Sequence, residues 1–73
     1  MALSAYIETT ITGHLTSRLP NDTEIAGQML ATRRWWKDER QRFELFTSLL
    51  VQQEASQGDP AAAAERLNVI AQL

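Results

Sequence analysis

Residues 5–12, with the sequence AYIETTIT, are the stretch from which the fold can be inferred first. Most of these residues are β-branched or aromatic, which favours an extended strand. Glu8 stands out because it lies among apolar residues, and a buried carboxylate costs several kcal/mol, roughly, unless it is protonated, paired or bound to a metal. Thr9 and Thr10 follow it, so the end of the predicted strand offers a carboxylate and two hydroxyls, which are ligands suited to a metal ion. Strand alternation also allows an edge strand with Glu8 on its solvated face, and the stretch alone leaves both interpretations open.

The size and composition of the chain predict one small cytoplasmic domain. The chain has 73 residues, which is enough for a single domain over residues 1–73. It contains no cysteine, so disulfides and thiolate metal sites are excluded and a reducing compartment is expected. The sequence has no apolar run of about 20 residues and no basic start followed by an apolar segment, so we expect neither a membrane span nor a secretory signal.

After the first strand, residues 14–18 could form a short helical turn that ends before Pro20. A long helix is predicted after this turn. Asn21 is a suitable N-cap, and Glu24 three residues later completes a pattern resembling a capping box. The helix should run to about residue 40, because Ile25, Met29 and Trp36 recur at helical spacing.

The second half of the chain repeats the order of strand and helices. Residues 42–47 are aromatic and aliphatic, which indicates a second strand. Ser48 is a suitable N-cap for a helix over residues 49–57, and Asp59 with Pro60 begins a final helix. The predicted fold class is therefore α/β, in the order β-α-α-β-α-α, with a short parallel sheet flanked by helices. Two strands are few for such a sheet, so we expect a truncated fold or one completed by a second chain.

Glu54 is the second acid that the sequence places in unexpected surroundings. On the helix over residues 49–57, it shares a face with Leu50, Val51 and Ala55, which should point to the core. This helix can lean over the end of the first strand and bring Glu54 towards Glu8. Two carboxylates and neighbouring hydroxyls would suit Mg²⁺ or Mn²⁺. The alternative is that Glu54 is a rim residue of an imperfectly amphipathic helix.

The basic residues are concentrated in one segment, although the net charge of the chain is only −2. Residues 33–37 read RRWWK, a combination that could bind phosphates and stack a base. In the alternative interpretation, Trp36 is a core anchor and the charges form a solvated face, with Arg34 paired to Asp38. The residues expected to contact nucleic acid are Arg33, Arg34, Trp35 and Lys37.

These segments together resemble a known family. Residues 6–11 (YIETTI) are similar to the opening strand of PIN-domain ribonucleases, in particular the VapC-like toxins of type II toxin–antitoxin pairs. Residues 42–48 (RFELFTS), then Glu54 and Ala55, then the segment that starts at Gly58 resemble the family's second strand and the two helices after it. The resemblance covers essentially the whole chain and implies a partial PIN-like domain.

The resemblance also implies a function. Glu8 would match the family's first metal-binding acid, which is usually Asp, and Glu54 would match the second. Thr9 or Thr10 would be the hydroxyl residue beside the metal. The implied activity is RNA cleavage that depends on Mg²⁺ or Mn²⁺, with RNA as substrate and an antitoxin protein as partner. The family's later acids belong to a C-terminal half that this chain lacks, so we expect the chain alone to be inactive.

Two other functions remain open from the sequence. The chain could be a non-catalytic remnant or interaction module whose open sheet edge or apolar helix face forms a homodimer or binds another chain. Alternatively, the chain could be all-helical, with residues 21–73 forming a small bundle that binds nucleic acid.

Overall fold

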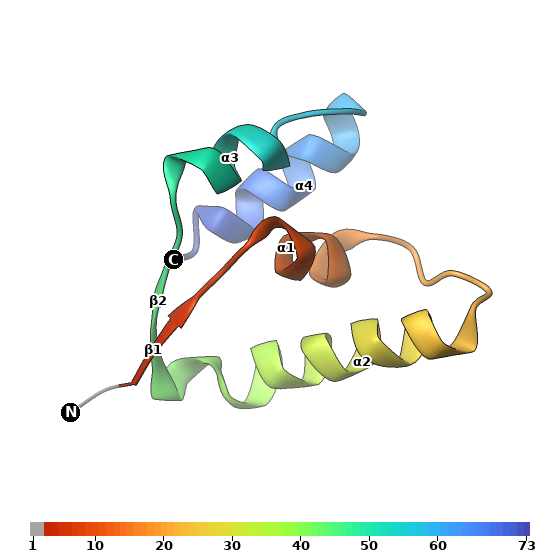
Figure 1. Ribbon diagram of the computed structural model, residues 1–73, viewed down its shortest axis with the longest axis horizontal. Coiled ribbons are helices and arrows are strands. Elements are labelled where there is room, and N and C mark those ends of the chain that lie inside the picture. The colour runs from red at the N-terminus through yellow and green to blue at the C-terminus, as the bar shows by residue number, and fades with distance from the viewer. Residues whose placement is uncertain (1–2) are drawn as a thin grey trace.

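The computed structural model describes residues 3–73 and shows a small α/β protein (Figure 1). Its elements are β1 (Leu3–Tyr6), α1 (Thr9–Thr16), α2 (Thr23–Asp38), the 3-10 turn η1 (Arg40–Arg42), β2 (Phe43–Phe46), α3 (Leu49–Ala55) and α4 (Pro60–Ile70). The predicted order of strands and helices is therefore confirmed, and the all-helical alternative is wrong.

The two strands form a parallel sheet, and a helix packs on only one of its two faces. Leu3 pairs with Phe43 and Tyr6 pairs with Phe46. Because side chains alternate along a strand, Leu3 and Phe43 share one face and Tyr6 and Phe46 share the other. Helix α2 packs on the first face, where the ring centroids of Trp35 and Phe43 are 5.4 Å apart.

The strand predicted over residues 5–12 is confirmed for Ala5 and Tyr6 and is wrong after them. The strand ends at Tyr6, and residues 9–12 form the first turn of α1. Two threonine hydroxyls form hydrogen bonds within this helix. The Thr12 hydroxyl donates to the carbonyl oxygen of Thr9, and the Thr16 hydroxyl donates to that of Thr12, each over 2.8 Å. Thr12 is completely buried. Packing of this helix against its neighbours thus overrides the strand preference of β-branched residues.

Helix α2 begins one residue later than the sequence suggested. Asp22, not Asn21, is the N-cap, and its carboxylate accepts from the backbone nitrogens of Glu24 and Ile25 at 2.9 and 3.1 Å. Asn21 and Asp22 are both good N-caps, so the position at which the helix begins depends on the path of the preceding loop.

Helices α3 and α4 begin at the predicted caps. The Ser48 hydroxyl accepts from the nitrogen of Val51 at 3.2 Å, and the Asp59 carboxylate accepts from that of Ala62 at 3.0 Å. Between the two helices, Gly58 adopts a φ of 84°, a conformation that favours glycine.

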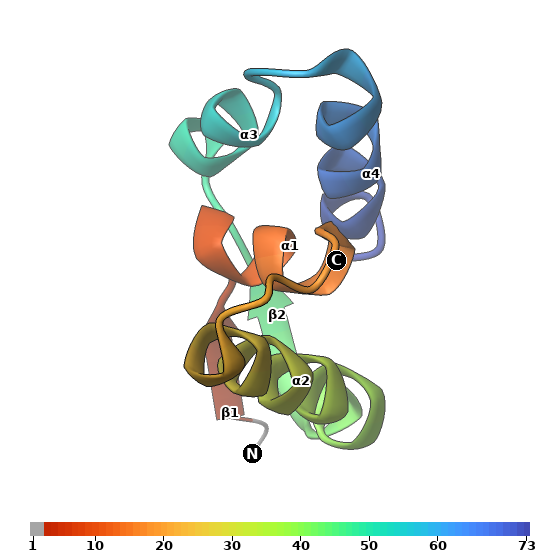
Figure 2. The same cartoon turned by 90° about the vertical axis from the view of Figure 1, so that its right-hand side faces the viewer.

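The core lies where α1 meets the other helices. Helix α1 contacts α2, α3 and α4, and Figure 2 shows it between α2 on one side and the α3–α4 pair on the other. Small residues let the helices of this pair approach closely, since Ala55 and Ala63 are both buried. The buried apolar residues are Ile7, Met29, Val51, Ala55, Ala63 and Val69.

No helix within residues 3–73 combines the length and the apolar character that crossing a membrane requires.

Candidate functional site

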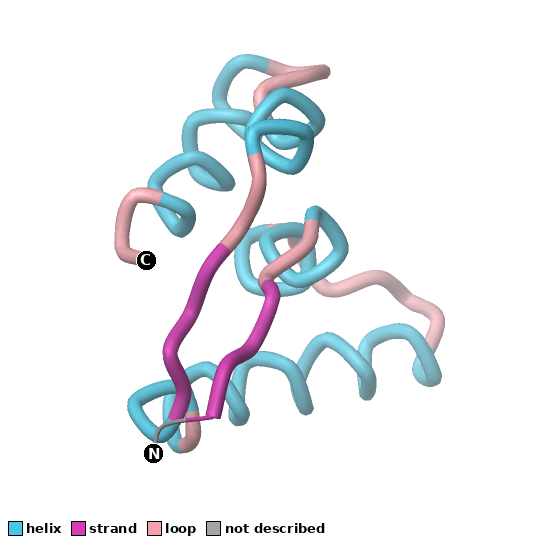
Figure 3. Tube along the Cα trace, turned by 60° about the vertical axis from the view of Figure 1, so that its left-hand side comes forward, coloured by secondary structure: helices cyan, strands magenta, loops and turns pink. Residues whose placement is uncertain are grey.

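The carboxyl ends of the two strands are held side by side. The backbone nitrogen of Ile7 donates to the carbonyl oxygen of Phe46 over 2.8 Å, which continues the sheet ladder past Tyr6. The Thr47 hydroxyl donates to the carbonyl oxygen of Ile7 over 2.7 Å. From this edge the chain leaves β1 into α1 and β2 into α3 (Figure 3). Residues that follow the strands are therefore gathered at one end of the sheet, where α/β proteins commonly bind ligands.

A pair of hydroxyls closes the same edge. The hydroxyl oxygens of Tyr6 and Ser48 are 2.9 Å apart, so the last residue of β1 contacts the N-cap of α3. Sequence reasoning missed this contact and the one made by Thr47, because both join residues about 40 positions apart and no local pattern reports them.

Glu8 lies at the start of α1, directly after the sheet edge. It occupies the N-cap position, and its side chain makes no capping hydrogen bond. Of the two interpretations of Glu8, the buried one is wrong, because the residue is exposed while Ile7 beside it is buried. Glu8 is solvated, as the alternative expected, but it lies after the strand and not within it. Glu8 is therefore accessible to solvent and to ions in it.

Glu54 is also exposed, near the end of α3. The core-facing interpretation of Glu54 is wrong and the alternative, an exposed position on an imperfectly amphipathic helix, is confirmed, because α3 buries Val51 and Ala55 and leaves Leu50 65% exposed. Helices α1 and α3 are in contact, so the two glutamates belong to adjacent elements. Within residues 3–73, neither carboxylate forms an ion pair or accepts a hydrogen bond.

The two threonines predicted beside the metal lie in the first turn of α1. Thr9 is half-buried and its carbonyl oxygen accepts from the hydroxyl of Thr12, whereas Thr10 is exposed. Across the part of the chain that the structure describes, no three or more histidine, cysteine, aspartate or glutamate side chains gather into a metal-binding group. The candidate site therefore offers two acids and two hydroxyls from the start of α1 and from α3.

Arg33 has a structural partner on α1. Its Nε donates to the carbonyl oxygen of His14 over 2.9 Å, and a terminal guanidinium nitrogen donates to the carbonyl oxygen of Ser17. These contacts leave Arg33 poorly placed for the phosphate contact that the sequence suggested.

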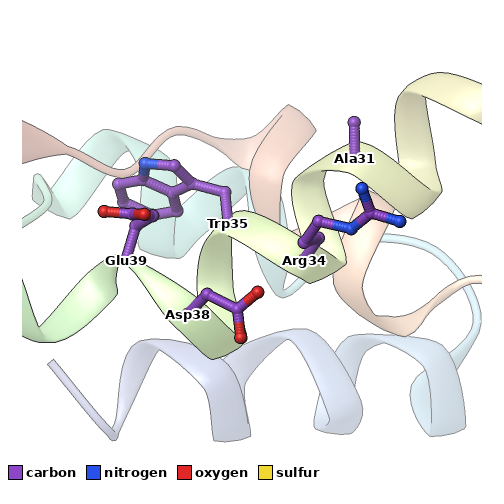
Figure 4. A pocket seen from close by; sticks show the side chains of 5 residues that line it. All are labelled: Ala31, Arg34, Trp35, Asp38 and Glu39. Carbon is purple, nitrogen blue, oxygen red and sulfur yellow. The ribbon is translucent and has the colours of Figure 1, made fainter.

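Arg34 and Trp35 line a shallow pocket of about 280 Å³ on α2 (Figure 4). Trp35 is half-buried, with one side of its ring towards Phe43. The expected pair between Arg34 and Asp38 is not among the ion pairs formed within residues 3–73, and Arg34 and Lys37 are both exposed. The residues that line the pocket are Ala31, Arg34, Trp35, Asp38 and Glu39.

The other basic side chains of this segment have intramolecular partners. Arg40 lies over the ring of Trp36, with its guanidinium carbon 4.4 Å from the ring centroid. Arg42 forms an ion pair with Glu39 at 2.8 Å. The basic residues of α2 with exposed charge are thus Arg34 and Lys37.

Comparisons with known proteins identify no relative of this chain. No family model matches the chain, and searches of curated proteins and of solved structures give no significant match.

Proposed function

We propose that the chain is a PIN-like domain derived from a divalent-metal-dependent endoribonuclease of the toxin–antitoxin type. In this proposal, Glu8 and Glu54 are the carboxylates that it contributes to an Mg²⁺ or Mn²⁺ site. One observation carries the proposal: Glu8 follows β1 at the carboxyl edge of a parallel sheet, and the helix with Glu54 follows β2 at the same edge. This is the place where the resemblance in the sequence expects the two acids.

The chemistry of the donor set fits a hard divalent cation. Both carboxylates are exposed and have no partner among residues 3–73, so binding a cation would break no ion pair there. Mg²⁺ is commonly held by one or two carboxylates, with waters and substrate phosphates as its other ligands. When bound, such an ion supplies a nucleophilic water and neutralises charge on a phosphoryl group. Thr10, two residues after Glu8, is exposed, and its hydroxyl would orient a water or a phosphate oxygen.

The RNA backbone would contact α2. Arg34 and Lys37 are the exposed basic residues of this helix, and the Trp35 ring lines the adjoining pocket. We retain RNA and an antitoxin protein as proposed partners, and a cytoplasmic location, which the absence of cysteine supports. Arg33 contributes by fixing α2 to α1 rather than by binding phosphate.

Metal binding is the direct test, because the two carboxylates could bind an ion even if the chain alone does not cleave RNA. Mn²⁺ is titrated into the full chain and the free ion is followed by electron paramagnetic resonance. We expect Glu8→Gln and Glu54→Gln each to weaken binding by about tenfold or more. Glu44→Gln is the matched control, because Glu44 is an exposed glutamate of β2 that lies outside the candidate site. Equal Mn²⁺ affinity in all four proteins would refute the metal role.

RNA binding is tested separately by the fluorescence anisotropy of a labelled single-stranded RNA over a range of salt concentrations. Replacing Arg34 or Lys37 with Gln should weaken binding and lower the slope of log affinity against log salt by up to about one for each lost phosphate contact. Arg18→Gln is the control, since Arg18 is exposed in the loop before α2. If Arg18→Gln has the same effect as the α2 variants, RNA binding is not localised to this helix.

A further inference from the structure

One face of the sheet has no covering helix among the described elements. Ser4 and Glu44 pair on this face, as do Tyr6 and Phe46. Figure 1 shows the four helices beyond the ends of the strands or on the opposite side of the sheet. We call the surface formed by Ser4, Tyr6, Glu44 and Phe46 the open face.

The open face is apolar at the end where the strands finish. Tyr6 is 48% exposed and Phe46 is 50% exposed, with their ring centroids 5.4 Å apart. The hydroxyl of Tyr6 contacts Ser48, and Leu49 and Leu50 begin α3 directly after it, with 75% and 65% of their surface exposed. Two aromatic residues at the ends of the strands and two leucines at the start of α3 are thus exposed to solvent. Parallel sheets are normally covered on both faces, so this exposure is unusual for the architecture.

The whole chain exposes more surface than a compact monomer of its mass, by about the area of one side of a protein interface. The accessible surface is 5307 Å², whereas a folded monomer of 8.2 kDa should expose about 4,540 Å², leaving an excess of about 770 Å². A stable interface of standard size buries about 800 Å² of each partner. The radius of gyration agrees, since 12.5 Å exceeds the value of about 11 Å for a compact domain of this length.

We propose that the open face, together with Leu49 and Leu50, is the interface of a symmetric homodimer, in which it packs against the same face of a second copy. A two-fold axis near Tyr6 and Phe46 would pack this aromatic patch against its own copy, as an isologous contact requires. Glu44 lies at the other end of the face, so the axis would separate the two copies of this carboxylate and leave each at the polar rim. Glu54 lies one turn after Leu50 on α3 and therefore borders this surface. The proposal does not depend on the metal site, because its apolar contact uses neither Glu8 nor Glu54.

Sedimentation equilibrium of the full chain tests the proposal over about 1 to 300 µM. We expect the wild-type chain to dimerise within this range. Phe46→Ser and Leu50→Ser should each raise the dissociation constant about tenfold or more, because they remove apolar side chains from the centre of the contact. Leu30→Ser is the matched control, since Leu30 is 52% exposed on α2 and lies outside the interface. Circular dichroism of each variant verifies the fold.

A second measurement keeps the proposal testable if the serine variants unfold. The chain has no cysteine, so Leu50→Cys and Leu30→Cys each introduce a single thiol. The thiol at position 50 should react with a maleimide more slowly as the protein concentration rises, whereas the rate at position 30 should stay constant. A chain that remains monomeric over the whole range overturns the proposal. A dimer that Phe46→Ser and Leu50→Ser leave unchanged overturns it as well.

Discussion

Arg33 and Arg66 perform the same task in the two halves of the chain. Each lies on the second helix after a strand and donates from its guanidinium to two carbonyl oxygens at the end of the first helix. For Arg66, Nε donates to Ala55 over 3.0 Å and a terminal nitrogen donates to Gln57 over 2.6 Å. The last carbonyl groups of a helix lack partners within it, so a cation there satisfies hydrogen bonds and complements the helix dipole.

Replacing Arg33 with Met should lower the free energy of unfolding by about 1–2 kcal/mol, because two charge-assisted hydrogen bonds to α1 are lost. Met keeps the helix propensity and most of the apolar stem of the side chain and removes the charged guanidinium with its donors. Urea denaturation measures the loss. The control is Arg34→Met on the same helix, which should change stability by less than about 0.5 kcal/mol because Arg34 is exposed. Equal losses in both variants would show that Arg33 does not cap α1.

Replacing Arg66 with Met should cost about 1–2 kcal/mol as well, because the carbonyl oxygen of the buried Ala55 loses its donor. Hydrogen exchange of the α3 amides is the second readout, since the loss of this contact should release the end of α3 before the rest of the chain. Glu65→Gln is the neighbouring control and should leave both measurements unchanged. Unaltered exchange in α3 after Arg66→Met would contradict the capping role.

The Tyr6 and Ser48 hydroxyls should be energetically coupled. Tyr6→Phe removes only the phenolic oxygen, and Ser48→Ala removes both this contact and the cap of α3. We expect Ser48→Ala to cost about 1 kcal/mol and Tyr6→Phe less, because the contact is exposed to solvent. In a double-mutant cycle measured by urea denaturation, the coupling should be about 0.5 kcal/mol. Strict additivity would mean that the hydroxyl pair contributes nothing to stability.

The features that were predictable from the sequence depend on neighbours a few residues apart. Ser48 and Asp59 cap their helices as predicted, because an N-cap acts on amides two or three residues away. The parallel pairing also followed from the order of strands and helices. Local chemistry and chain order therefore establish the fold class.

The errors concern residues whose surroundings come from distant parts of the chain. Thr12 is in a helix because it packs at the centre of the domain, which its own strand preference does not indicate. Glu54 faces solvent because α1 and α4 contact the side of α3 that carries Val51 and Ala55. Arg33 appeared to be a phosphate ligand because the carbonyl groups that it caps lie 16 and 19 residues earlier. Sequence periodicity gives the faces of a helix but not which neighbour covers them.

Thr47 should help to fix the position of Glu8 relative to α3 in the candidate metal site. Its hydroxyl donates to the carbonyl oxygen of Ile7, the residue before Glu8, and this part-buried bond of 2.7 Å links the ends of the two strands. Thr47→Val keeps the shape of the side chain but removes the donor, so the carbonyl group loses this partner. We expect a loss of about 1–2 kcal/mol in urea denaturation and a weaker affinity for Mn²⁺, because Glu8 would no longer be fixed relative to α3. Thr23→Val, at the exposed start of α2, is the control and should change neither quantity. A Thr47→Val protein that loses stability but binds Mn²⁺ as the wild type does would show that the carboxylates do not depend on this link.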